Sequence, residues 1–249
     1  MPSDAQQSNL IRYKEKIRSE TGRDIEIRAI QKLGLEGIVA CFKLHPSVIL
    51  VETAVNFKST NPAWEDTIAH EITHGYLVYK YSYCLWKPKT EICRNKMEYF
   101  NILFSMVDDI VVNKIIQDHG FQPFNSVYLQ VIEEETKAVH KGKDYYEKFN
   151  EDSLLKNIFI VWRYIQVWSC LNYLKLKHYE RRLFKKFIKE FQISYKKQYE
   201  KADKVKQIIL QNNIFLASSH LYAMQEILKQ WNLEDLVILG TYNSLFPAQ

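Results

Sequence analysis

The chain has 249 residues, a formal net charge of +5 at pH 7 and a hydrophobic content of 47%. This composition excludes a disordered chain, and the length allows one large core or two small domains. The first 24 residues are polar and charged, and no apolar run is long enough to span a bilayer. We therefore expect a cytoplasmic protein without a membrane segment, in which the cysteines are free thiols. The alternative is a disulfide between Cys84 and Cys93, which flank a loop.

The first predicted elements are a helix and a strand. Residues 8–23 carry apolar side chains at helical spacing, and Gly22 is placed to end this helix. Residues 24–30 alternate between apolar and polar side chains, as a half-buried strand does.

A hairpin is predicted next. Residues 37–44 and 48–55 are rich in β-branched side chains, and the turn signal His45-Pro46-Ser47 separates them. The chain therefore supplies a small sheet before its first long helix.

The helix predicted from Pro62 to about Tyr81 carries the pattern His-Glu-x-x-His. Asn61 before Pro62 is typical of an N-cap followed by proline at the first helical position. His70 and His74 lie one turn apart on one helix face, so both imidazoles can reach a single metal ion. Glu71 lies beside them, where a carboxylate can take a proton from water. The pattern predicts a zinc site, against the alternative of two incidental histidines.

After this helix, the sequence predicts a loop at residues 86–89 and then mainly helices. The predicted helices cover residues 90–117, 127–140, 153–177, 179–212 and 218–231. We expect an α+β fold with a small core at 1–125 and a mostly α-helical extension at 126–249.

A catalytic zinc site takes three protein ligands and a water molecule, so a third ligand is needed. The metzincin extension requires a glycine and a histidine where this chain has Leu77 and Lys80, so that pattern is excluded. The helix after Pro88 offers four carboxylates instead, those of Glu91, Glu98, Asp108 and Asp109.

The pair Asp108-Asp109 lies in an apolar stretch, where a charge is costly unless it is paired or bound to metal. Asp109 is the first choice, with Asp108 and Glu98 left open. Asn113 lies one turn after Asp109 and can hydrogen-bond a ligand. The alternative is a surface carboxylate pair bonded to Lys114 or an arginine.

His70-Glu71-x-x-His74 followed by Asp109-x-x-x-Asn113 resembles a group of predicted bacterial minimal zinc metallopeptidases of the zincin class. The upstream layout is similar to that of gluzincins and of ImmA/IrrE-type peptidases. The resemblance covers about residues 20–120. It implies a zincin core, with a small mixed sheet whose edge strand lies over the His-Glu-x-x-His helix.

The resemblance also implies a mechanism. Zn²⁺ on His70, His74 and Asp109 would acidify a water molecule, and Glu71 would receive its proton as general base. A peptide or protein substrate would pair along an edge strand, for which residues 48–55 are placed. An oxyanion donor is expected, and the candidates are Tyr76, Tyr128, His119 and His220.

Two other functions remain open beside the metallopeptidase. One is a zinc hydrolase of a non-peptide amide. The other is a regulatory or nucleic-acid-binding protein that uses the fold to sense. Glu71 argues against the second, because a structural zinc site needs no general base.

The segment 175–206 holds twelve Lys and Arg against four Asp and Glu, a net charge of +8. Its aromatic residues recur near helical spacing, which indicates an amphipathic helix with a core stripe and a solvated basic face. Glu180, Glu190 and Glu200 interrupt the cations, which disfavours nucleic acid. An acidic partner is the other possible use of this segment.

Overall fold

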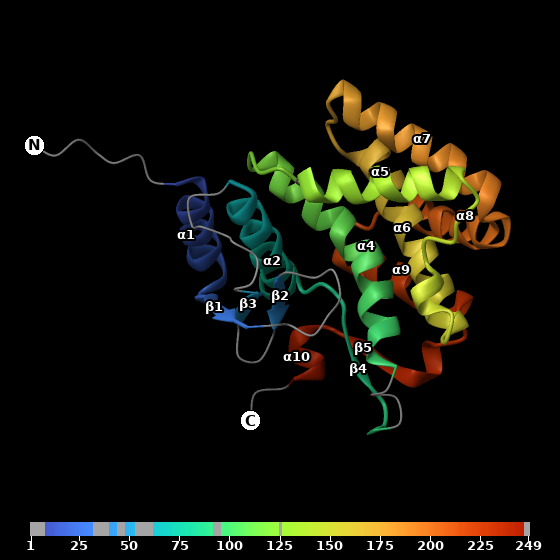
Figure 1. Cartoon of the computed structure of the whole chain (residues 1–249). Helices are drawn as coiled ribbons and strands as arrows, with labels where there is room; N and C mark the ends of the chain where they lie inside the picture. The colour runs from blue at the N-terminus through green and yellow to red at the C-terminus, as the bar shows by residue number, and fades with distance from the viewer. Residues whose placement is uncertain are drawn as a thin grey trace, which may run out of the picture. The chain divides into compact units, whose positions relative to one another are not determined.

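The computed structural model describes residues 8–31, 40–43, 48–52, 62–91, 96–124 and 126–246 (Figure 1). The fold is α+β, with small sheets and a mostly helical C-terminal part, which confirms the predicted class.

The chain divides into two compact units. The first comprises Met1–Ser82 and Val112–Asn125, and the second comprises Tyr83–Val111 and Ser126–Gln249. One continuous helix, α4 (Met97–Asp118), contributes residues to both. The domain boundary expected at 125/126 stays a prediction.

The first unit begins with helix α1 (Asn9–Thr21), which confirms the predicted N-terminal helix. The Ser8 hydroxyl caps it by accepting a hydrogen bond from the Ile11 N–H at 3.3 Å. Gly22 ends it in the left-handed conformation, with φ of 65°, which a residue without Cβ adopts at little cost.

A three-stranded mixed sheet follows, with strands β1 (Glu26–Ile30), β2 (Ala40–Lys43) and β3 (Val48–Glu52). The strand order is β1-β3-β2, with β1 parallel and β2 antiparallel to β3. The β2–β3 pairing confirms the predicted hairpin, although its turn, residues 44–47, lies outside the described residues.

The expectation that residues 48–55 form the edge strand is wrong, because β3 is the central strand. Val48, Ile49, Leu50 and Val51 are all buried. A continuous apolar run is typical of a strand that is covered on both faces and paired on both sides. Strand β2 therefore forms the edge beside helix α2 (Pro62–Tyr81).

Helix α2 packs closely on the sheet through Gly75. A Cβ atom at this position would lie 2.8 Å from Ile25 Cδ1 and 3.0 Å from Phe42 Cζ. Because Gly75 has no side chain, helix α2 can approach Ile25 and Phe42 closely at the position that follows His74. The predicted N-cap, Asn61, lies outside the described residues.

The second unit is a helical bundle with a two-stranded sheet. Its helices are α5 (Ser126–His140), α6 (Ser153–Tyr173), α7 (His178–Ser194), α8 (Lys196–Gln211), α9 (Ala217–Gln230) and α10 (Tyr242–Leu245), with 3-10 turns at Glu147–Phe149 and Glu234–Leu236. Helix α7 packs on α5 and α6, and α8 packs on α6 and α9 (Figure 1).

Two predictions for this unit are wrong. The expected loop at 86–89 lies largely within strand β4 (Leu85–Pro88), which pairs with β5 (Val237–Gly240) in a region where no strand was predicted. The two strands lie about 150 residues apart in sequence, so no local pattern reveals their pairing. The helix expected over 179–212 is broken at Tyr195, whose ψ of 51° separates α7 from α8.

The aromatic stripe of the basic segment belongs to the core, as predicted. Phe184, Phe187 and Phe191 are between 0% and 1% exposed and face the interior of the second unit. Over the described part of the chain, no helix is long and apolar enough to cross a membrane.

Candidate metal centre

The site begins on helix α2, where the His-Glu-x-x-His pattern lies on a half-exposed face. His70, Glu71 and His74 are partly exposed, whereas Ile72 and Thr73 are fully buried. The Thr73 hydroxyl lies 2.7 Å from the Tyr13 hydroxyl and donates to the Ala69 carbonyl at 2.6 Å. This buried face fixes the rotation of α2 and so directs the polar side chains outward.

The Tyr13 hydroxyl stays protonated beneath this helix. Burial raises its pKa to about 12. The phenol is therefore a neutral hydrogen-bonding group at neutral pH.

The two histidines turn the same ring nitrogen toward each other. Their Nε2 atoms lie 3.2 Å apart, and their rings meet edge to face with centroids 4.9 Å apart. Two nitrogens bound to one tetrahedral zinc at about 2.0–2.1 Å lie roughly 3.3 Å from each other. The observed separation therefore suits two ligands of one ion.

Asn113 on helix α4 lies beside His70, which gives Asn113 a partner among the predicted ligands that the sequence did not specify. Its Oδ1 atom lies 3.2 Å from His70 Nδ1, and its side chain is buried. An amide oxygen only accepts, so Nδ1 carries the proton and Nε2 keeps its lone pair for a metal ion. A histidine that binds a metal through one ring nitrogen commonly donates the N–H of the other nitrogen to an oxygen acceptor.

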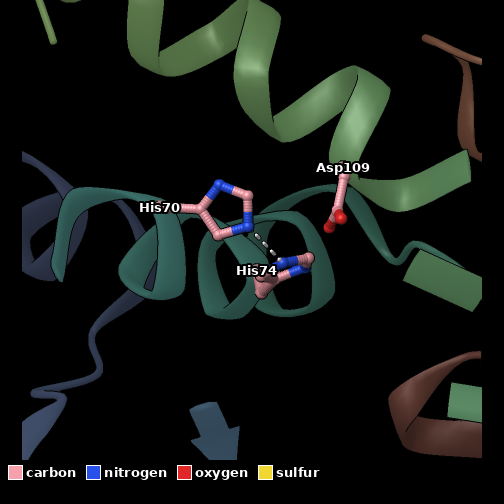
Figure 2. A group of neighbouring side chains, drawn as sticks. All are labelled: His70, His74 and Asp109. Carbon is pink, nitrogen blue, oxygen red and sulfur yellow. Dashed lines mark hydrogen bonds between the residues drawn. The ribbon is translucent and has the colours of Figure 1, made fainter. Parts of the chain in front are cut away.

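Asp109 lies one turn before Asn113 on the same helix and completes a group of three. One ligand atom each from His70, His74 and Asp109 lies within 4.8 Å of the other two (Figure 2). The structure thus brings together the three residues that the sequence predicts as metal ligands.

Gln166 on helix α6 orients Asp109, and the sequence analysis missed this residue. Its Nε2 atom donates to Asp109 Oδ2 at 3.1 Å and to the Ser105 carbonyl at 3.2 Å. The Gln166 side chain is buried, and it holds the Oδ2 atom of the Asp109 carboxylate in place. Its position as a polar residue within the apolar run of α6 was the sequence signal that could have indicated a buried polar contact.

The other acidic candidates lie elsewhere. Asp108 points to a different partner, since its Oδ1 atom lies 2.7 Å from Nε2 of the buried His220. Glu98 is exposed at the start of α4, about 16 Å along the helix from Asp109 at 1.5 Å per residue. Glu91 is exposed before α4 begins.

Glu71 contacts the edge strand of the sheet. Its Oε2 atom accepts a hydrogen bond from the backbone N–H of Phe42 in β2 at 2.8 Å. Because Phe42 is in the edge strand, this N–H points away from β3 and toward α2. Burial and the Glu71 charge raise the pKa of the neighbouring Cys41 thiol, which stays protonated.

The residues considered as oxyanion donors are engaged with other groups. The Tyr76 hydroxyl donates to Glu20 at 2.5 Å, and His119 Nε2 lies 2.7 Å from Lys16 Nζ. Tyr128 is close to Arg163, whose guanidinium carbon lies 5.7 Å from its ring centre, and His220 contacts Asp108. None of these contacts involves the His70–His74–Asp109 group, within the described residues.

Two imidazoles and one carboxylate match the donors of catalytic zinc, which binds three protein ligands and leaves a position open. The same donor set serves iron(II) in some oxygenases, so donor type alone does not identify the ion. No protein-family model, no curated protein and no solved structure matches the chain.

Proposed function

We propose that the chain is a zinc-dependent metallopeptidase, with His70, His74 and Asp109 as metal ligands and Glu71 as general base. The observation that carries the proposal is the three-residue group beside Glu71. Glu71 follows His70 directly in sequence, and its carboxylate accepts the N–H of Phe42 in the edge strand, where a peptide could pair.

The metal would acidify a water molecule and polarise the carbonyl under attack. The protein residues have separate tasks. Asn113 and Gln166 hold His70 and Asp109 in the orientation of ligands. Glu71 accepts the proton of the attacking water and returns it to the leaving amine.

Strand β2 supplies the place for an extended substrate. Along an edge strand the backbone N–H and C=O groups of every second residue point away from the sheet. The backbone groups of Ala40 therefore point in the same direction as those of Phe42. A peptide that pairs there binds through its main chain, which gives sequence-tolerant recognition. Its carbonyl replaces Glu71 at the Phe42 N–H, and the carboxylate becomes available for proton transfer.

The test compares wild type with Glu71→Gln, His74→Ala and Asp109→Ala. Metal content is measured by mass spectrometry, and hydrolysis with a pool of fluorescence-quenched peptides. Glu71→Gln should keep the zinc and lose hydrolysis by about 10²–10⁴-fold, because it removes the base and no ligand. His74→Ala and Asp109→Ala should lose the zinc itself.

Glu98→Gln is the matched control, because it removes an exposed carboxylate from the same helix as Asp109. It should leave both readouts unchanged. Iron in place of zinc would overturn the identity of the metal, and full zinc content in Asp109→Ala would overturn the ligand assignment. Zinc-loaded wild type that cleaves no peptide would overturn the peptidase.

A further inference from the structure

Helix α7 presents a surface of exposed cations that the proposed metal site does not use. We define the α7 basic face as Arg181, Arg182, Lys185, Lys186 and Lys189, all of which are exposed. At 100° per residue these five positions lie within an arc of about 140°, and they extend over about 12 Å of helix. In Figure 1 this helix lies alongside α5, in the second unit.

The acidic residues of this segment are withdrawn from the face. Glu180 is buried, and its Oε2 accepts the N–H of Lys177 at 2.7 Å, which caps the start of α7. Glu190 is largely covered and lies 3.1 Å from His140 Nδ1. In the sequence these glutamates interrupt the cations, which disfavoured nucleic acid. On the exposed surface of α7 they do not interrupt the cations.

The cations form no close ion pairs in the described part of the chain, and an acidic group within their electrostatic influence is Glu133 on α5, whose pKa is lowered by Lys137 and, to a smaller extent, by Lys186. Among the described residues, none of the five members of the α7 basic face forms an ion pair. Residues 175–199 contain nine Lys and Arg, all exposed, and only the two withdrawn glutamates, which gives a net charge of +7. Five unpaired cations on one face of a helix attract a polyanion.

The chemistry of the face selects among polyanions. Every exposed residue between 181 and 189 is cationic, so the centre of the face lacks the apolar or aromatic anchor of a protein interface. An amphipathic helix enters a membrane with its apolar face, and here that face is buried in the core at Phe184, Phe187 and Phe191. Polar, strongly cationic surfaces without anchors are typical of nucleic-acid contacts.

We propose that the α7 basic face binds the sugar-phosphate backbone of nucleic acid without sequence preference. Cations four residues apart recur about every 6 Å along the helix, and phosphates of one strand recur every 3.4 Å of duplex axis. Lysine and arginine side chains on one face can therefore each reach a phosphate. The proposal does not depend on the metal centre, because its residues and charges are separate.

The test measures binding of the full chain to two fluorescent DNA duplexes of unrelated sequence, by polarisation over a range of salt concentrations. Wild type should bind both equally, with affinity that falls steeply with salt. Arg182→Gln with Lys186→Gln and Lys189→Gln should weaken binding by at least about tenfold and reduce the salt slope by about three.

The matched control is Arg12→Gln with Arg18→Gln and Lys204→Gln, which removes the same charge from exposed positions elsewhere. It should bind almost as wild type. Equal losses in the two triple variants would overturn the proposal, as would a salt-insensitive wild type. Tighter binding to phosphatidylserine vesicles or to poly-glutamate, at equal concentration of negative charge, would assign the face to a membrane or an acidic protein instead.

Discussion

Asn113 positions the ring of His70 through an acceptor that does not titrate. An amide oxygen at 3.2 Å from Nδ1 fixes the tautomer without changing charge with pH. Because Asn113 follows Asp109 by one helical turn, the sequence predicts that it can bond a metal ligand, but not that this ligand is His70. It does not predict Gln166, because a glutamine in an otherwise apolar helix shows only that some polar partner exists.

We expect Asn113→Ala to weaken zinc binding by about 10–100-fold, since the imidazole loses the acceptor that orients it. Competition with a chromogenic chelator measures the affinity. Asn113→Asp is the matched control, because its carboxylate still accepts the Nδ1 proton, and it should bind zinc nearly as wild type. Unchanged affinity in Asn113→Ala would show that His70 needs no partner.

At the scale of elements, local signals predict most helices and fail for long-range strand pairing. The proline at the first turn and the apolar pattern place α2 correctly, from Pro62 to Tyr81. Strand β4 was missed because its partner β5 lies at the other end of the chain. The position of β3 inside the sheet depends on β1, which also pairs from a distance.

Gly75 controls how closely α2 approaches the sheet. Gly75→Val places new methyl groups where a Cβ alone would already lie 2.8 Å from Ile25 Cδ1. We expect it to lower the free energy of unfolding by about 1–3 kcal/mol through overpacking, as measured by urea denaturation. Ile25→Val in the same chain removes that methyl and should restore part of the loss.

Lys80→Val is the control for helix propensity, because it places the same side chain at the exposed end of α2. It should cost clearly less than Gly75→Val. A loss as large as that of Gly75→Val would mean that valine is costly anywhere in α2, and that close packing at Gly75 is not the cause.

At the scale of the whole molecule, buried thiols make the free energy of unfolding depend on pH in the alkaline range. Burial in α6 raises the pKa of Cys170 from about 9 to about 12. Between these values the unfolded chain loses the thiol proton and the folded chain keeps it. This contribution to stability is therefore complete below pH 9 and is lost as the pH rises toward 12, at up to about 1.4 kcal/mol per pH unit.

Cys170→Ala should accordingly show a shallower decrease of unfolding free energy between pH 9 and pH 10.5 than wild type. Urea denaturation at several pH values measures the two slopes. Val167→Ala, which removes buried volume from the same helix without a titrating group, should keep the wild-type slope. Parallel curves for wild type and Cys170→Ala would contradict the prediction.

The hydrogen bond between Phe42 and Glu71 has a further consequence for the sheet. A bare edge strand invites strands of other chains to add to it and aggregate. In β2 the outward N–H of Phe42 is already occupied by a charged carboxylate, so an intruding strand must first displace that charge. The residue that we propose as general base therefore also disfavours the addition of a strand from another chain at this position.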